Sequence, residues 1–284
     1  MGREQERAGD WIETQLAAFG YEAKRHAYKY DGKSRESIYA TKVGSDRPDQ
    51  MYIVSAHMDS FNLDDTAGGF APGADDDASG TALVLEAARV FGLAGVTTSV
   101  SVRFILWNNE ETGLDGSSAY AAGRQALQGM QDPPGSGEFP EPSWLGVIQH
   151  DMILFDHGIP PGPEQSSAAD VDIEFQRTSR MATEAEALAV ALLAGNAVFS
   201  TDYPAEVGDR MDYTDSVPFQ DLCAAVSVRE NQRIAEIGAG SNPHWHHDTD
   251  VVGTYSDADF RLGFNATQMT VGTVAKLAGV TMAP

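Results

Sequence analysis

Residues 51–108 hold a strand, a helix and a second strand in direct succession. The apolar run "MYIVSA" (51–56) predicts a buried strand, "GTALVLEAARVFGLAG" (80–95) a helix, and "VSVRFILWN" (100–108) another strand. This order is typical of a parallel sheet that is covered by helices. The stretch therefore predicts an α/β fold.

The same alternation continues on both sides of this stretch. We expect one domain over residues 1–284, with a mostly parallel, mixed central sheet and helices on both faces. Apolar runs predict strands at 144–150, 171–175 and 223–228, and helical spacing predicts helices at 4–19, 181–199 and 256–277, the last opened by the capping box "SDAD".

Composition restricts the class of partner. The net charge of −23 argues against nucleic acid or an anionic membrane surface. No apolar run reaches the roughly 18 residues of a membrane span, and the opening "MGREQERAGDW" lacks the apolar core of a signal peptide. Cys223 is the single cysteine, which excludes an intrachain disulfide, and its apolar neighbours predict a buried thiol.

Two long segments are rich in proline and glycine, at 131–142 and 158–170. They are either plain surface connections or the rim of a cleft.

Acidic and imidazole side chains directly follow three of the predicted strands. His57 and Asp59 follow the first, Glu110 and Glu111 the second, and Asp151 the third. Ligands of open α/β sheets bind beyond the carboxyl ends of the strands. We therefore expect these side chains to gather at one edge of the sheet.

Two further motifs add to this set. "PGADDDASG" (72–80) places three aspartates between small residues, and "NPHWHHDTD" (242–250) offers three imidazoles. The aspartates form either a solvated turn or a cation site, and they lack the spacing of an EF-hand loop. Imidazole and carboxylate ligands without thiolate suit catalytic zinc, and two adjacent ions need a bridging carboxylate. So acidic a surface is also compatible with additional calcium, for which the sequence indicates no site.

In these motifs the chain resembles the bacterial di-zinc aminopeptidases, a zinc exopeptidase family that also includes the glutaminyl cyclases. The resemblance rests on "AHMDS", "PGADDDASG", "NNEETGLDGS", "HDM" and "NPHWHHDTD", in order, and covers roughly residues 4–280. It implies two zinc ions per chain. His57 and Asp151 would be ligands of one ion, and Glu111 and His246 would be ligands of the other. Asp76 would bridge the two ions.

The resemblance also implies roles for neighbouring groups. Glu110 is similar to the general base that takes a proton from a water held between the ions and passes it to the leaving amine. Asp59 is similar to a carboxylate that orients His57. A cis peptide bond is implied between Asp76 and Asp77.

Three imidazoles compete for the C-terminal ligand position. The family spacing after Asn242-Pro243 selects His246, which follows an aromatic residue and has an acid, Asp250, four residues on. His244 also has an acid four residues on and remains the alternative.

Three residues are predicted to contact substrate. Arg210 would help to hold the substrate terminus, Asp215 would support the pocket, and Trp245 stands where some relatives carry tyrosine. An indole donates a hydrogen bond but cannot act as a phenol. Ser216 departs from the histidine that many members have at this position.

These observations predict a monomeric zinc aminopeptidase that acts on peptides with a free N-terminus and is secreted or extracytoplasmic by family analogy. One alternative is a glutaminyl cyclase, which would use one zinc. A dipeptidase or carboxypeptidase would need a cation that binds the substrate carboxylate, for which Arg210 is a weak candidate. A binding domain with a relict site is disfavoured, because every ligand position is filled.

Overall fold

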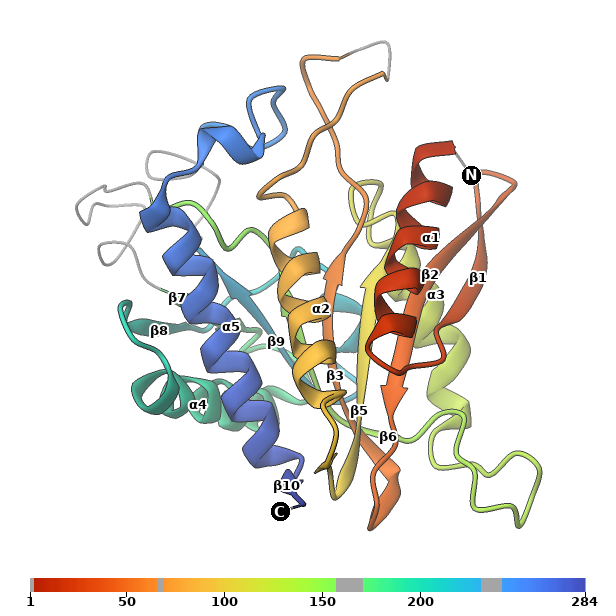
Figure 1. Ribbon diagram of the computed structural model, residues 1–284. Coiled ribbons are helices and arrows are strands. Elements are labelled where there is room, and N and C mark those ends of the chain that lie inside the picture. Colours follow the sequence, from red (N-terminus) through yellow and green to blue (C-terminus); the bar gives the residue numbers. More distant parts are fainter. Residues whose placement is uncertain (1–2, 66–68, 157–170, 231–241, 284) are drawn as a thin grey trace.

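The computed structural model describes residues 3–65, 69–156, 171–230 and 242–283, and it is built around a mixed sheet of eight strands (Figure 1). The strand order is β1-β2-β5-β3-β6-β9-β7-β8. The strands are β1 (Lys24–Tyr30), β2 (Lys33–Lys42), β3 (Arg47–His57), β5 (Val100–Trp107), β6 (Ser143–His150), β7 (Val171–Phe175), β8 (Ala205–Gly208) and β9 (Ala224–Arg229).

The four central strands β5, β3, β6 and β9 are parallel to one another. The hairpin β1–β2 adds to β5 in the antiparallel sense, and β7 pairs antiparallel with β9 and parallel with β8. The predicted mixed sheet with a parallel centre is therefore confirmed.

Helices cover both faces of this sheet (Figure 1). Side chains of β5 alternate between two cores: Phe104 and Leu106 belong to the core that α1, α2, α4 and α5 cover, whereas Ile105 and Trp107 belong to the core that includes residues of α3 and η2. The helices are α1 (Arg3–Ala18), α2 (Ala78–Phe91), α3 (Asp115–Arg124), α4 (Ala182–Phe199) and α5 (Asp257–Leu277), with short 3-10 turns η1 (Gln125–Leu127), η2 (Val217–Phe219) and η3 (Val252–Thr254).

Local expectations mostly hold. The capping box forms between Ser256 and Asp259, and Cys223 is buried. The sequence missed α3, because only a few of its small and polar residues, Tyr120 among them, face the core. It also missed β8 and a two-stranded sheet of β4 (Val96–Thr97) and β10 (Thr281–Met282).

One helix in the described part of the chain, α4, could cross a membrane by length and composition alone, with 33% of its apolar window buried. In this fold it packs against β7, β8, β9 and α5. Core helices of globular folds pass the same test.

The two proline-rich segments differ in what the structure shows. Segment 131–142 leads into the amino end of β6, so it lies away from the carboxyl edge and does not form a rim there. Segment 158–170 lies outside the described residues.

Candidate metal centre

The parallel strands carry the predicted ligands to one edge, as expected. His57 ends β3 and lies opposite Trp107, the last residue of β5, while Asp151 directly follows β6. Glu110 and Glu111 come directly after β5 in the turn that precedes α3. The carboxyl ends of three neighbouring parallel strands therefore meet here.

The carboxylate of Asp76 lies between two imidazoles. Its Oδ1 is 3.1 Å from His57 Nε2, and its Oδ2 is 3.1 Å from His246 Nε2. One carboxylate oxygen therefore faces each imidazole, which is the arrangement of a group that bridges two ions.

A further carboxylate stands beside each imidazole. Glu111 Oε2 lies 2.8 Å from His246 Nε2, and Asp151 Oδ1 lies 4.0 Å from His57 Nε2. The five predicted ligands therefore form two groups that share Asp76.

The donor set fits zinc. Ligand atoms of His57 from one group, Glu111 from the other and the shared Asp76 lie within 4.8 Å of one another, which is close enough for two adjacent ions. Glu111 Oε1 is buried and makes no hydrogen bond within the described residues, and His57 Nε2 has only the Asp76 carboxylate at 3.1 Å, in a direction that is poor for a hydrogen bond. Buried polar atoms are normally bonded, so these two atoms indicate ligand positions for a cation.

The three C-terminal imidazoles point in different directions. His244 Nδ1 lies 2.9 Å from Thr249 Oγ1, and His247 Nδ1 lies 3.0 Å from Asp64 Oδ2. Of the three, His246 alone has an ion-pair distance to Asp76. The geometry thus favours His246 over His244 as the ligand.

The charges of the centre are strongly coupled. Burial lowers the pKa of His57, but Asp77, Asp59 and Asp76 outweigh this and raise it well above its usual value. Burial likewise opposes protonation of His246, yet Asp76 and Glu111 raise its pKa to about 9. Without metal the imidazoles therefore hold protons, which zinc would have to displace.

For the two adjacent glutamates, burial raises the pKa, whereas for the two imidazoles it lowers it. Burial, then the charge of Asp76, raises the pKa of Glu111 to about 7. Burial, followed by the charges of Asp151 and Asp215, raises the pKa of Glu110 well above its usual value. So many buried carboxylates in one place favour bound cations.

Asp59 contacts His57 through both its backbone and its carboxylate. His57 Nδ1 lies 3.0 Å from the carbonyl oxygen of Asp59 and 3.6 Å from its carboxylate. The carboxylate also accepts the backbone N–H groups of Glu110 at 3.2 Å and Glu111 at 3.3 Å. Asp59 is therefore placed to orient the imidazole and to position the two glutamates.

Asp77 joins three elements below the centre. Its carboxylate accepts the N–H groups of His57 (3.0 Å), Gly80 (3.0 Å) and Met152 (3.3 Å). It thereby caps α2 and connects it to the ends of β3 and β6. The peptide bond between Asp76 and Asp77 is cis, as predicted.

Sequence reasoning missed two residues of the site. Arg229, at the end of β9, is almost fully buried, and its Nη1 lies 3.4 Å from Asp151 Oδ2. A charge directly after an apolar strand was the available signal. The ring of Phe61 lies 5.2 Å from that of His246, and no motif in the sequence marks this residue. Trp245, which was predicted, stacks on His246 with the ring centres 3.8 Å apart.

The remaining predicted residues have local partners. Asp215 is buried, accepts a hydrogen bond from Ser117 Oγ at 2.5 Å, and has a pKa that burial raises to about 7. Ser216 accepts a hydrogen bond from Ser227 at 2.9 Å. Arg210 is half exposed and pairs with Asp212 at 3.1 Å.

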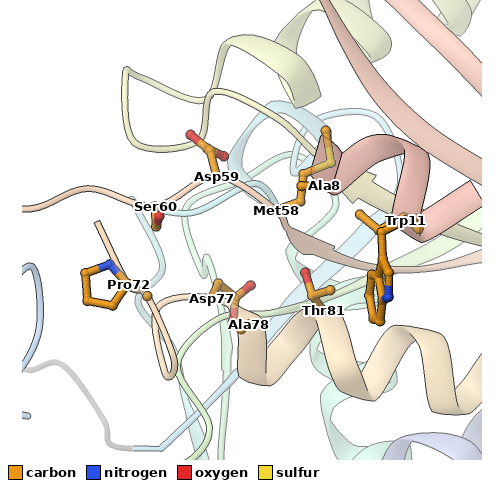
Figure 2. A pocket seen from close by; sticks show the side chains of 11 residues that line it. Ala8, Trp11, Met58, Asp59, Ser60, Pro72, Asp77, Ala78 and Thr81 are labelled. Carbon is orange, nitrogen blue, oxygen red and sulfur yellow. The ribbon is translucent and has the colours of Figure 1, made fainter. Parts of the chain in front are cut away.

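A pocket of about 180 Å³ opens beside the centre, between α1, the segment after β3 and the start of α2 (Figure 2). Asp59 and Asp77 line it together with Met58 and the half-exposed Trp11. It therefore lies on the side of the groups that support His57.

The sequence profile of peptidase family M28 matches residues 37–262 of this chain. A probable aminopeptidase of Saccharomyces cerevisiae is 35% identical over 122 residues, which cover 39% of this chain and 33% of that protein. A probable leucine aminopeptidase of Arthroderma otae is 38% identical over 122 residues, 39% and 32% of the two chains. The chain therefore spans about a third of the length of these relatives in the matches.

Two solved structures have the same fold. The LapA aminopeptidase of Legionella pneumophila matches with a TM-score of 0.69 and 20% identity, over 96% of this chain and 65% of that one. The glutaminyl cyclase of Porphyromonas gingivalis matches with a TM-score of 0.66 and 19% identity, over 96% and 90%. At this identity the likeness concerns the fold alone.

Proposed function

This chain belongs to peptidase family M28, and from that membership and the geometry of the centre we propose that it is a zinc-dependent aminopeptidase. It would remove the N-terminal residue of peptides, using two zinc ions that Asp76 bridges. The observation that carries the proposal is the position of the Asp76 carboxylate between His57 and His246. Asp151 and Glu111 would complete the two ligand sets.

Bound zinc would polarise the scissile carbonyl and make water nucleophilic at neutral pH. Glu110 would take the proton of the attacking water and pass it to the leaving amine. Its location supports this role: the Asp59 carboxylate holds its backbone N–H, and its own carboxyl group is buried near Asp151 and Asp76.

The relatives named as probable aminopeptidases support a substrate with a free amine. Trp245, stacked on His246, would contact the substrate from the same side.

A second candidate is glutaminyl cyclisation, because the zinc exopeptidases that the motifs of this chain resemble also include the glutaminyl cyclases. The complete set of two ligand groups favours hydrolysis, since the cyclase alternative needs one ion.

The decisive assay is hydrolysis of leucine para-nitroanilide by the purified protein, by the chelated protein, and after zinc is returned. We expect activity that chelation removes and zinc restores. In parallel, a peptide that begins with glutamine separates release of glutamine from loss of ammonia by mass spectrometry. Zinc-loaded protein that cleaves neither the anilide nor any peptide with a free N-terminus would contradict the proposal.

A further inference from the structure

One buried side chain, Asp250, holds the backbone that presents Asp76. Its Oδ1 accepts the N–H of Asp75 at 2.8 Å, and its Oδ2 accepts the N–H of Asp76 at 3.1 Å. Asp250 is 2% exposed. A carboxylate that accepts one N–H on each oxygen fixes both peptide groups in position and direction, with hydrogen bonds stronger than neutral ones.

Asp250 is itself held by a buried network. The Tyr255 hydroxyl donates to Asp250 Oδ1 at 2.6 Å. The side-chain amide of Asn242 donates to the Tyr255 hydroxyl at 3.0 Å and to the Asp75 carboxylate at 2.7 Å. Such a connected network leaves the Asp250 carboxylate little freedom to move.

The backbone of Asp250 reaches both halves of the centre. Its carbonyl accepts the N–H of Ala74 at 3.0 Å, in the loop that carries Asp76. Its own N–H donates to the carbonyl of His247 at 3.1 Å, next to the turn that carries His246. One residue therefore joins the two segments that supply the bridging carboxylate and the C-terminal imidazole.

We propose that Asp250 is a positioning residue that keeps the Asp76 carboxylate in register with His246, so that one carboxylate can serve two ions at once. The proposal rests on the proposed function, because it assigns the bridging role to Asp76. Both oxygens of Asp250 already accept backbone N–H groups. Asp250 would therefore act on the ions through the position of Asp76 and not as a ligand. Groups that hold metal ligands in place typically contribute 10- to 100-fold to metal affinity.

The test is Asp250→Asn. Its amide oxygen can accept one N–H, and its NH₂ group must then face the other. We expect zinc affinity, measured by competition with a chromophoric chelator, to fall roughly 10- to 100-fold. The visible spectrum of the cobalt-substituted protein should change, and kcat should fall more than KM rises. In the metal-free protein, the amides of Asp75 and Asp76 should lose hydrogen-exchange protection.

Two further variants keep the test sharp. Tyr255→Phe removes one donor to Asp250 but leaves its bonds to the two amides, so it should weaken zinc binding less than Asp250→Asn. Asp257→Asn makes the same chemical change at an exposed position in the first turn of α5 and should leave all readouts unchanged.

The outcomes separate this proposal from the proposed function. If folded Asp250→Asn or, should it not fold, Tyr255→Phe keeps wild-type zinc affinity and cobalt spectrum, the positioning role is overturned and the aminopeptidase activity stands. If the wild type binds two ions without cleaving any peptide, the proposed function fails, while the effect on metal affinity still decides the role of Asp250.

Discussion

Two clusters of buried charge in this fold follow opposite rules. One is the centre around Asp76, and the other joins Arg103 of β5 to Glu141, just before β6. In the second cluster, Arg103 Nη1 lies 2.6 Å from Glu141 Oε2, and the two side chains are 3% and 0% exposed. Opposite charges thus compensate each other inside the protein.

The pair of Arg103 and Glu141 is also saturated with hydrogen bonds. Glu141 accepts from the Tyr120 hydroxyl at 2.8 Å and from Trp144 Nε1 at 2.5 Å, while Arg103 Nε donates to Thr41 Oγ1 at 2.9 Å. The metal centre instead crowds several carboxylates around two imidazoles and leaves Glu111 Oε1 without a hydrogen bond among the described residues. Buried charge that is fully paired serves stability, whereas buried charge left underbonded points to a bound cation.

The largest effect is expected at the underbonded centre. Glu110→Gln keeps the size of the side chain but removes its capacity to take a proton, so kcat should fall on the order of 10³-fold. Zinc content, measured by atomic absorption, should stay at two ions per chain in this variant. Glu86→Gln, a partly exposed position on α2, serves as the control. Near-wild-type turnover of Glu110→Gln would refute its role as base.

A change in the Arg103–Glu141 cluster should lower the unfolding free energy but leave turnover unchanged. Glu141→Gln leaves Arg103 buried without its counter-charge, which should cost about 3 kcal/mol of unfolding free energy in urea titrations. The turnover of the remaining folded protein should not change. Replacing both partners, as Arg103→Met with Glu141→Leu, should recover part of the loss. A fall in turnover of folded Glu141→Gln would show that the two clusters are not independent.

Zinc should stabilise the protein through the metal centre, independently of the Arg103–Glu141 cluster. Free zinc at about 100 times the Kd of each site should raise the unfolding free energy by roughly 2.7 kcal/mol per bound ion, about 5.4 kcal/mol for two. Because the clusters share no residue, wild type and Glu141→Gln should gain the same increment. Thermal melts with and without chelator check this, and unequal shifts would contradict the separation.

A smaller effect, on the pH dependence of stability, is expected at His150. Unlike the groups of the two clusters, this buried side chain is uncharged and has both ring nitrogens hydrogen-bonded. Its ring bonds the carbonyl of Ser55 at 3.0 Å and Thr270 Oγ1 at 2.9 Å, and burial lowers its pKa to about 4. An exposed imidazole has a pKa near 6.5. The unfolded chain therefore binds more protons as pH falls below about 6.5, and stability is lost in that direction.

Between pH 7 and 5.5 this loss should amount to about 1 kcal/mol. His150→Gln should remove that part of the pH dependence, measured by urea titration at fixed zinc concentration. An unchanged slope in the variant would show that His150 is not its source.

Much of the fold and the centre could be predicted from local patterns. The parallel strands, their helices and the residues that follow them are read directly from the sequence, because burial on both faces of a sheet demands apolar runs. The weakly periodic α3 could not be read this way. Nor could the position of segment 131–142, since its composition does not say which edge of the sheet it joins.

By itself, the sequence determined the order of the central elements, the chemistry at the ends of β3, β5 and β6, and the acidic triplet, because these depend on neighbours along the chain. Spacing already favoured His246, and the structure places its ring beside Asp76. The tertiary structure alone decided that the Asp59 carboxylate holds the two glutamates and that Arg229 reaches Asp151. It also brought Asp250 to the amides of Asp75 and Asp76. These contacts join residues far apart in the chain, and their directions follow from packing, which no local pattern records.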